Sequence, residues 1–196
     1  TIVADYDAFA RAQDPVRAAQ RGDAAAARIW PDNSPAAVAA RRTALQRFAQ
    51  RLQALPKTGL SEEDALNRDL LLGRVQSGLE GFQFDEERLN FISGDGFYTT
   101  ADYAALNTPL DSPADAEAWI ARLEALPGYY ERETANLRRG IETGFTQPRR
   151  TVERAIEDVR GQLAQPAATT PLLAPFRNVS RSFPADQLAV FESRAE

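Results

Sequence analysis

Two runs of acidic residues are the first candidates for chemistry in this sequence. Residues 62–64 are Glu-Glu-Asp and residues 85–87 are Asp-Glu-Glu. Paired carboxylates could serve as general acid and general base. The first run, however, follows Ser61 at the start of a predicted helix, where a Ser cap and acidic side chains stabilise the positive end of the helix dipole. We therefore interpret it as a capping sequence rather than a catalytic pair.

Arg149 and Arg150 contradict a local rule of helix chemistry. They follow Pro148 in the first turn of a predicted helix, where a cation at the positive end of the dipole costs about 0.3–1 kcal/mol. A salt bridge, to Glu153 or to another nearby acid, would account for both residues without a function. If they have a function, a fork-shaped guanidinium would hold a carboxylate or pair with another part of the protein. This position is the best single candidate for an anion contact.

The composition excludes several classes of reaction. The 196 residues include no Cys and no His, so the chain cannot itself supply thiolate or imidazole ligands to zinc, a Cys nucleophile or a Ser-His-Asp triad. The formal net charge is -5, and Arg alternates with acidic residues, which predicts neither a nucleic-acid surface nor a polybasic membrane patch. No apolar run approaches the roughly 18 residues of a membrane span.

Apolar residues recur at helical spacing through most of the chain. A stripe containing Leu45, Phe48 and Leu52 ends before Pro56, and a capping pattern at Ser61 starts the next helix, which predicts a helical hairpin. Other helix starts are predicted near residues 3, 15, 113, 127, 148 and 184. We expect a single all-α domain over residues 1–196, a bundle of about seven helices in antiparallel hairpins.

The helical period fails in residues 84–110, so we expect one long irregular segment there. Its glycines and aromatic residues are typical of an irregular, partly extended crossover, within which residues 100–106 are compatible with a single helical turn. Gly94-Asp95-Gly96 lacks the further glycines and the Lys of a phosphate-binding loop, and we interpret it as a tight turn. Long connections of this kind often have a function.

Several motifs follow one another in a fixed order along the chain. Residues 110–130 read LDSPADAEAWIARLEALPGYY, residues 137–150 combine a helix ending in Gly with Pro-Arg, and Gln162-Leu163 end the next predicted helix. The upstream pieces are Asp14-Pro15, Gly22-Asp23, Ser34-Pro35, Arg41-Arg42 and residues 66–71. This ordered set covers nearly the whole chain. It resembles a large bacterial family of uncharacterised proteins, domain-of-unknown-function family 885.

The resemblance implies a function that these residues do not themselves reveal. Members of the family are much longer, largely helical, and carry an HExxH zinc motif in their C-terminal half, which makes them similar to gluzincin-type metallopeptidases. The motif has no counterpart here, so no catalytic residue, metal ligand or cofactor site carries over, and zinc is expected only in the missing C-terminal half. The resemblance implies that this chain packs beside the catalytic helices and helps wall a substrate cleft.

We expect the chain to be a fragment, because a sequence without Met cannot begin translation at Thr1 and helix-forming residues continue to Glu196. Its expected partners are the missing C-terminal catalytic half and a peptide substrate, with no nucleic acid and no membrane span. Secretion signals are common in the family, which favours the periplasm or cell envelope.

The candidate substrate or anion contacts are Arg149, Arg150, Tyr98 and Asp95. The alternative function is a free-standing helical interaction or scaffold module without enzymatic activity. The two hypotheses differ in the surface that they predict. A cleft wall should expose a large apolar face where the missing half docks, whereas a free-standing module should have a closed core and a largely polar surface.

Overall fold

The computed structural model describes residues 1–181 and 183–195 and confirms the all-α fold class. The helices are α1 (Ile2–Gln13), α2 (Pro15–Gln20), α3 (Pro35–Gln53), α4 (Glu62–Gly81), α5 (Phe97–Leu106), α6 (Pro113–Glu124), α7 (Leu126–Glu142), α8 (Arg149–Leu163), α9 (Ala174–Arg177) and α10 (Ala185–Ala195). Short 3-10 turns are η1 (Ala26–Arg28), η2 (Glu86–Leu89), η3 (Ala167–Thr169) and η4 (Pro171–Leu173), and the two-residue strands are β1 (Phe91–Ile92) and β2 (Asp95–Gly96).

Polar side chains cap several of the predicted helix starts. Asp14, Ser34, Ser61 and Ser112 each accept a hydrogen bond from the backbone N–H three residues later, at 3.0–3.4 Å. Each such cap satisfies a donor that the helix itself cannot pair, which fixes where the helix begins.

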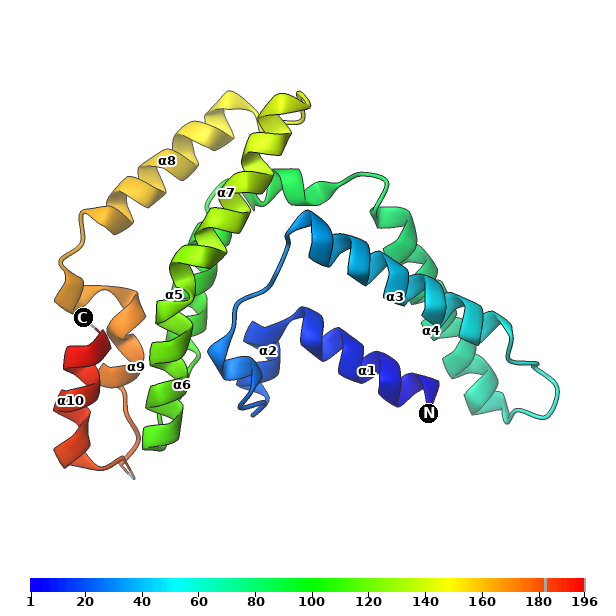
Figure 1. The fold of residues 1–196 in the computed structure, drawn as a ribbon, viewed down its shortest axis with the longest axis horizontal. Coiled ribbons are helices and arrows are strands. Elements are labelled where there is room, and N and C mark those ends of the chain that lie inside the picture. The colour runs from blue at the N-terminus through cyan, green and yellow to red at the C-terminus, as the bar shows by residue number, and fades with distance from the viewer. Residues whose placement is uncertain (182, 196) are drawn as a thin grey trace.

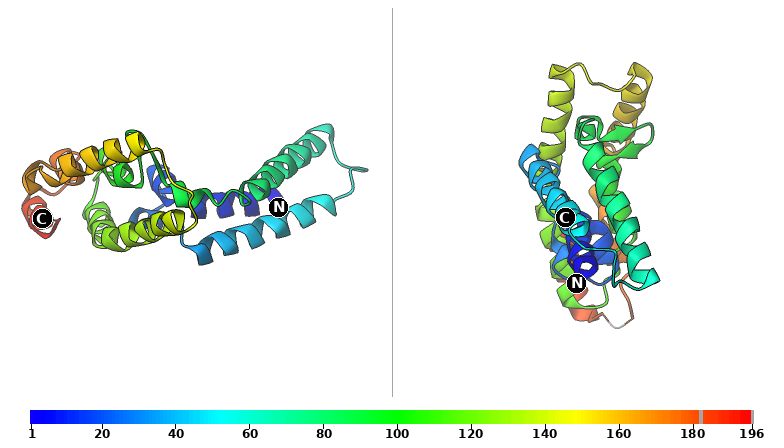
Figure 2. Two further views of the ribbon diagram at one scale, coloured as in Figure 1. Left: turned by 90° about the horizontal axis from the view of Figure 1, so that it is seen from above. Right: turned by 90° about the vertical axis from the view of Figure 1, so that its right-hand side faces the viewer.

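The helices form an elongated molecule (Figures 1 and 2). At one end, α3 and α4 form the predicted antiparallel hairpin, and α1 packs against α3. In the centre, α6 leads into α7, with α5 beside them. From the end of α7 the chain turns back into α8, while α9 and α10 pack against each other at the C-terminal end, where α10 also contacts α6.

The buried apolar side chains form three clusters. The largest joins α5, α6, α7 and α10 and contains both Trp residues, Trp30 and Trp119. The second lies in the α3–α4 hairpin and is closed by α1. The third joins Phe91, Tyr98 and Ala155, and so connects the strands, α5 and α8. The hairpin cluster leaves one face of α4 uncovered, where Leu66 and Leu70 are exposed.

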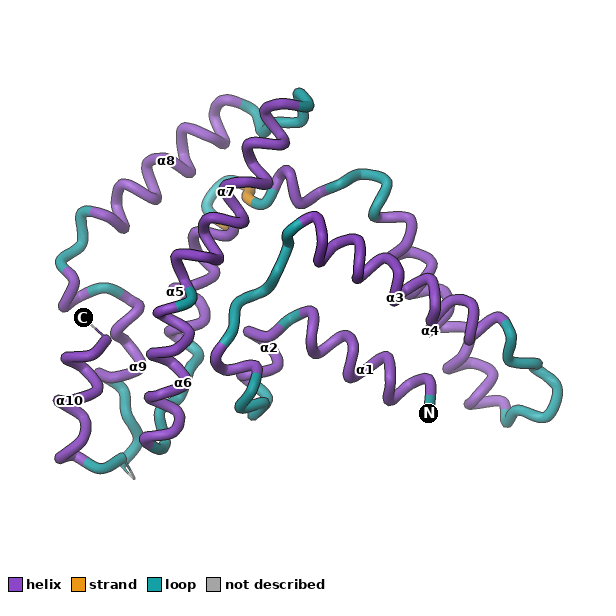
Figure 3. Tube along the Cα trace, in the orientation of Figure 1, coloured by secondary structure: helices purple, strands orange, loops and turns teal. Residues whose placement is uncertain are grey.

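The segment 84–110 is less irregular than the sequence suggested. Its first part contains η2 and an antiparallel hairpin of β1 and β2, in which Phe91 pairs with Gly96 (Figure 3). Residues 97–106, however, form the ten-residue helix α5 rather than a single turn. The buried side of α5 consists mainly of Ala101, Ala104 and Ala105, and such small residues give little apolar periodicity in a sequence.

A buried arginine fastens the N-terminal part of the chain to α6. The guanidinium of Arg122 donates to the carbonyl oxygens of Pro15, Ala26 and Ile29 at 2.6–3.2 Å. It also lies 5.1 Å from the centre of the Trp30 ring. Burial lowers the pKa of Arg122 to about 10. The loop before α3 is therefore held by a charged side chain on α6, in the middle of the main core.

Candidate functional site

An apolar groove between α7 and α8 is the main candidate site. It has a volume of about 350 Å³, and apolar side chains from α7, α8, β1 and α5 line it, among them Phe91, Phe97, Leu137, Val152, Ile156 and Val159. Two isoleucines on its edges are open to solvent, with exposed fractions of 70% for Ile141 and 44% for Ile156. Contiguous apolar surface of this kind is typical of a place where another molecule or domain packs.

The β1–β2 hairpin positions the aromatic side chains of this groove. Gly94 turns the chain with a φ of 79°, and Gly96 has a φ of 155°. A Cβ atom at Gly96 would collide with the Cβ of Phe91, so only glycine allows the two strands to approach this closely. The tight turn predicted at these residues is present.

Asp95 is part of the same turn. Its Oδ1 accepts hydrogen bonds from the backbone N–H of Gly96 at 2.8 Å and from the Thr99 hydroxyl at 2.7 Å. The Thr99 hydroxyl in turn accepts from the Gly96 N–H at 3.1 Å, which caps the start of α5. Asp95 therefore stabilises the turn and the start of α5, and this structural role accounts for the residue without a ligand.

Tyr98 lies in the lining of the groove, and its side chain is buried against α8. Burial raises the pKa of the Tyr98 phenol, and the neighbouring carboxylates of Asp158 and Asp95 raise it further. The phenol is therefore protonated at neutral pH and can offer a hydrogen bond but not a negative charge. Of the four candidate contacts, Tyr98 is the one that the structure places in the apolar groove.

Arg149 and Arg150 lie at the start of α8, outside the groove lining. The Nε of Arg149 donates to Oε1 of Glu153 at 2.7 Å, so the salt bridge that the sequence offered as an explanation is present. The Arg149 side chain is 91% exposed. Among residues 1–181 and 183–195, no hydrogen bond or ion pair joins either arginine to Tyr98 or Asp95. The four candidates thus do not form one site.

Two glutamines, whose contacts the sequence did not predict, attach α8 and the loop before it to the rest of the site. The Gln147 side chain donates to the carbonyl of Phe91 at 2.5 Å. Gln162 donates to the carbonyl of Tyr98 at 3.1 Å and to a carboxylate oxygen of Asp102 at 3.2 Å. Burial raises the pKa of Asp102, which the Gln162 hydrogen bond partly offsets. These bonds set the width of the groove at both ends of α8.

A buried polar cluster on α7 holds the segment that leads into β1. The Glu133 carboxylate, almost fully buried, accepts from the Asn33 amide at 2.9 Å and from the Asn90 amide at 2.6 Å. The Asn136 amide donates to the carbonyl of Asn33 at 2.8 Å. The sequence carries a signal for this cluster, because Tyr129, Glu133 and Asn136 recur at helical spacing on one face of α7.

The donor set of this chain does not suit a zinc site. No group of three or more His, Cys, Asp or Glu side chains in the described ranges 1–181 and 183–195 is placed to hold a metal ion. The sequence as a whole contains neither His nor Cys, the usual ligands of zinc.

A membrane-spanning helix is also absent from the described ranges 1–181 and 183–195, because every helix there is too short or too polar to cross a bilayer.

Comparison with known proteins identifies a family. The sequence profile of a family described as bacterial protein of unknown function, DUF885, matches residues 15–196. No curated protein matches the chain.

Proposed function

Because this chain belongs to the bacterial protein family DUF885, we propose that it is the non-catalytic N-terminal helical region of a zinc-dependent peptidase, in which it forms part of the substrate-cleft wall. The zinc ligands and the catalytic residues are supplied by a C-terminal half, since this sequence contains no His. The metallopeptidase part of the proposal rests on the resemblance of the family to gluzincin-type enzymes.

The observation that supports this role is the apolar groove between α7 and α8. Although Arg88 and Arg160 belong to its lining, the surface that the groove exposes is almost entirely apolar. Ile141 and Ile156 expose apolar area that a stable complex would remove from water. Burying one such side chain contributes about 1.5–3 kcal/mol, which favours packing of a further domain against this face. In the proposed arrangement, the catalytic half covers the groove, and the rim of the groove borders the substrate.

Peptide contacts would come from one residue in the groove lining and from one outside it at the start of α8. The buried phenol of Tyr98 can donate a hydrogen bond, and the exposed guanidinium of Arg149 can pair with a peptide carboxylate if Glu153 releases it. Because this salt bridge is exposed, its contribution is about 0–1 kcal/mol, and a better-placed carboxylate could replace it.

The proposal can be tested with one substitution in the protein encoded by the complete gene. Ile156→Asp places a charge in the apolar groove, and we expect it to lower the hydrolysis of fluorogenic peptides at least tenfold, because even about 1.4 kcal/mol of lost packing corresponds to a factor of ten. Bound zinc, measured by elemental analysis, should remain unchanged, since the residue lies outside the metal site.

Leu66→Asp is the matched control. Leu66 is an exposed leucine on α4, outside the groove lining, and the same charge placed there should change the hydrolysis rate less than twofold. Circular dichroism of the chain carrying either substitution checks that the helices persist. Equal rates for Ile156→Asp and the unmodified protein would show that the groove is not part of the cleft wall.

A second candidate function is a free-standing helical interaction or scaffold module. The observation that favours it is the main core, in which Leu110 and Ala116 have no exposed surface although nothing outside the chain covers them. This function predicts that the complete gene product binds no zinc and hydrolyses no peptide. In that case the α7–α8 groove would be the interaction surface of the module.

A further inference from the structure

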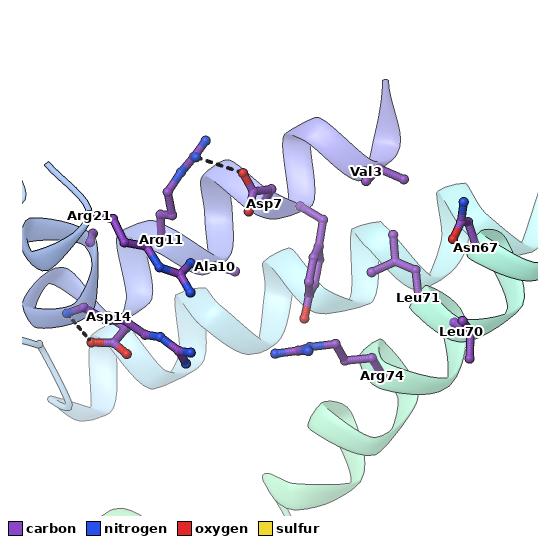
Figure 4. A pocket seen from close by; sticks show the side chains of 13 residues that line it. Val3, Asp7, Ala10, Arg11, Asp14, Arg21, Asn67, Leu70, Leu71 and Arg74 are labelled. Carbon is purple, nitrogen blue, oxygen red and sulfur yellow. Dashed lines mark hydrogen bonds and ion pairs between the residues drawn. The ribbon is translucent and has the colours of Figure 1, made fainter. Parts of the chain in front are cut away.

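A second, larger cleft lies at the other end of the molecule, between α1, α2 and α4 (Figure 4). It has a volume of about 880 Å³. Four arginines line it: Arg11 on α1, Arg17 on α2, Arg21 directly after α2, and Arg74 on α4. Figure 4 shows Arg74 extending from α4 toward the helices that carry the other three. We call this cavity the arginine cleft.

The two carboxylates in the lining already have partners. Oδ2 of Asp7 lies 3.0 Å from a guanidinium nitrogen of Arg11, and Oδ1 of Asp14 accepts from the backbone N–H of Arg17 as the cap of α2. Within the described ranges 1–181 and 183–195, no hydrogen bond or ion pair engages the guanidinium groups of Arg17, Arg21 and Arg74.

This arrangement costs stability unless something binds there. Arg17 and Arg21 are four residues apart, a spacing at which like charges on a helix repel by about 0.2–0.5 kcal/mol. Arg74 brings a third positive charge from the opposite wall, in a chain whose net charge is -5. The cleft is therefore a local concentration of positive charge on an acidic protein, which attracts anions into it.

The other part of the lining is apolar. Val3 on α1 and Leu70 on α4 belong to it, and both side chains are largely exposed. A small inorganic anion would leave these apolar side chains in water. A ligand that carries both carboxylates and apolar groups would satisfy the whole lining.

We propose that the arginine cleft binds an acidic peptide segment in which carboxylate and apolar side chains alternate. The carboxylates pair with Arg17, Arg21 and Arg74, because the guanidinium fork matches the two oxygens of a carboxylate. The apolar side chains pack on Val3 and Leu70. A nucleic acid is disfavoured, because the charge of the chain outside the cleft is negative and would repel its phosphates. The proposal does not depend on the peptidase role of the chain.

The test measures fluorescence anisotropy with two labelled decapeptides, one of alternating Glu and Leu and one of alternating Gln and Leu, at about 50 mM salt, where screening is modest. We expect the acidic peptide to bind the chain at least tenfold more tightly than the Gln peptide. Arg21→Gln and Arg74→Gln should each weaken its binding about tenfold, the effect of losing one charge-assisted hydrogen bond.

Two further variants separate the cleft from general charge attraction. Arg138→Gln removes an exposed arginine on α7 that is outside the cleft, and it should change the affinity less than twofold. Leu70→Ser removes apolar lining without changing charge, and it should weaken binding of the acidic peptide about threefold or more. All four substituted positions are exposed, so circular dichroism should report an unchanged fold for every variant. They are Arg21, Leu70, Arg74 and Arg138.

Several outcomes would overturn the proposal. One is an acidic peptide that does not bind below about 1 mM, which corresponds to only about 4 kcal/mol of affinity. Another is an equal loss of binding for Arg138→Gln and Arg74→Gln, since the attraction would then be general. A third is displacement of the peptide by an equal concentration of inorganic phosphate or a ten-nucleotide single strand, which would indicate an oxyanion or nucleic-acid site instead.

Discussion

Replacing Arg122 by Met should release the N-terminal part of the chain from α6. Methionine keeps an unbranched side chain of similar length but removes the guanidinium. The carbonyl oxygens of Pro15, Ala26 and Ile29 then lose their bonds to the guanidinium, and the cation over the Trp30 ring is lost as well. The Ala26 carbonyl keeps one donor, the backbone N–H of Ile29 at 3.3 Å.

The structure allows the size of this effect to be worked out. A buried acceptor left without a donor costs about 1–3 kcal/mol, so the carbonyls of Pro15 and Ile29 together cost at most about 2–6 kcal/mol. Loss of the buried cation over the Trp30 ring adds about 2 kcal/mol. Burying the guanidinium is itself unfavourable by several kcal/mol, as the lowered pKa of Arg122 indicates, and the substitution recovers that part. We therefore expect a net loss of about 3 kcal/mol, which is a large share of the roughly 5–15 kcal/mol that stabilises a typical domain.

Urea unfolding followed by tryptophan fluorescence is the appropriate assay, because Trp30 and Trp119 both lie in the core around Arg122. With a slope of about 2 kcal/mol per molar urea, a loss of 3 kcal/mol lowers the midpoint by about 1.5 M. Arg138→Met, at an exposed position, should shift it by less than about 0.3 M, since most surface substitutions change stability by less than 0.5 kcal/mol. A loss below about 1 kcal/mol for Arg122→Met would refute the reasoning, because the carbonyls would then be satisfied without the arginine.

Three other predictions concern single substitutions. Gly140→Ala should destabilise the chain by about 2 kcal/mol, because the new Cβ would lie 2.8 Å from the carbonyl oxygen of Phe145 and 2.9 Å from that of Arg88. Gly73→Ala, where nothing lies within 4 Å, should instead stabilise it by about 0.5–1 kcal/mol, and thermal unfolding distinguishes the two signs. Asp102→Asn should raise stability at pH 7. The raised pKa of Asp102 means that the unfolded state binds fewer protons than the folded state, so stability falls as pH rises through the range between the two pKa values. The advantage of Asn should vanish in urea unfolding below that range, and an unchanged advantage at all pH values would contradict the assignment.

Local signals in the sequence were sufficient to predict most helices. The caps at Ser34, Ser61 and Ser112 act within three residues of themselves, so a short window contains the whole interaction. Helix α5 was expected only as a single turn over residues 100–106, because its buried side is formed largely by alanines and Tyr98. The buried Arg122 and Glu133 were not anticipated either, because charged side chains are almost always exposed, and only their spacing within apolar stripes reveals them.

The candidate site could be predicted only in part. The start of α8 near residue 148 was predicted from the sequence. The pairing of Val152, Ile156 and Val159 with α7, however, depends on the β1–β2 hairpin and on the bond from Gln147 to Phe91, and these contacts join segments that are distant in sequence. Arg149 stood out because it opposes the helix dipole, and its partner Glu153 lies one turn away, which made the salt bridge predictable. The arginine cleft combines residues from α1, α2 and α4, so no local pattern could indicate it.

The most direct test of the proposed role compares this chain with the protein encoded by the complete gene, for bound zinc and for peptide hydrolysis with and without a chelator. We predict that the complete protein binds about one zinc ion and hydrolyses peptides until the chelator removes the metal, the behaviour of a catalytic zinc site. The chain alone should do neither. A complete protein without zinc, or hydrolysis that persists after the metal is removed, would contradict the role proposed here.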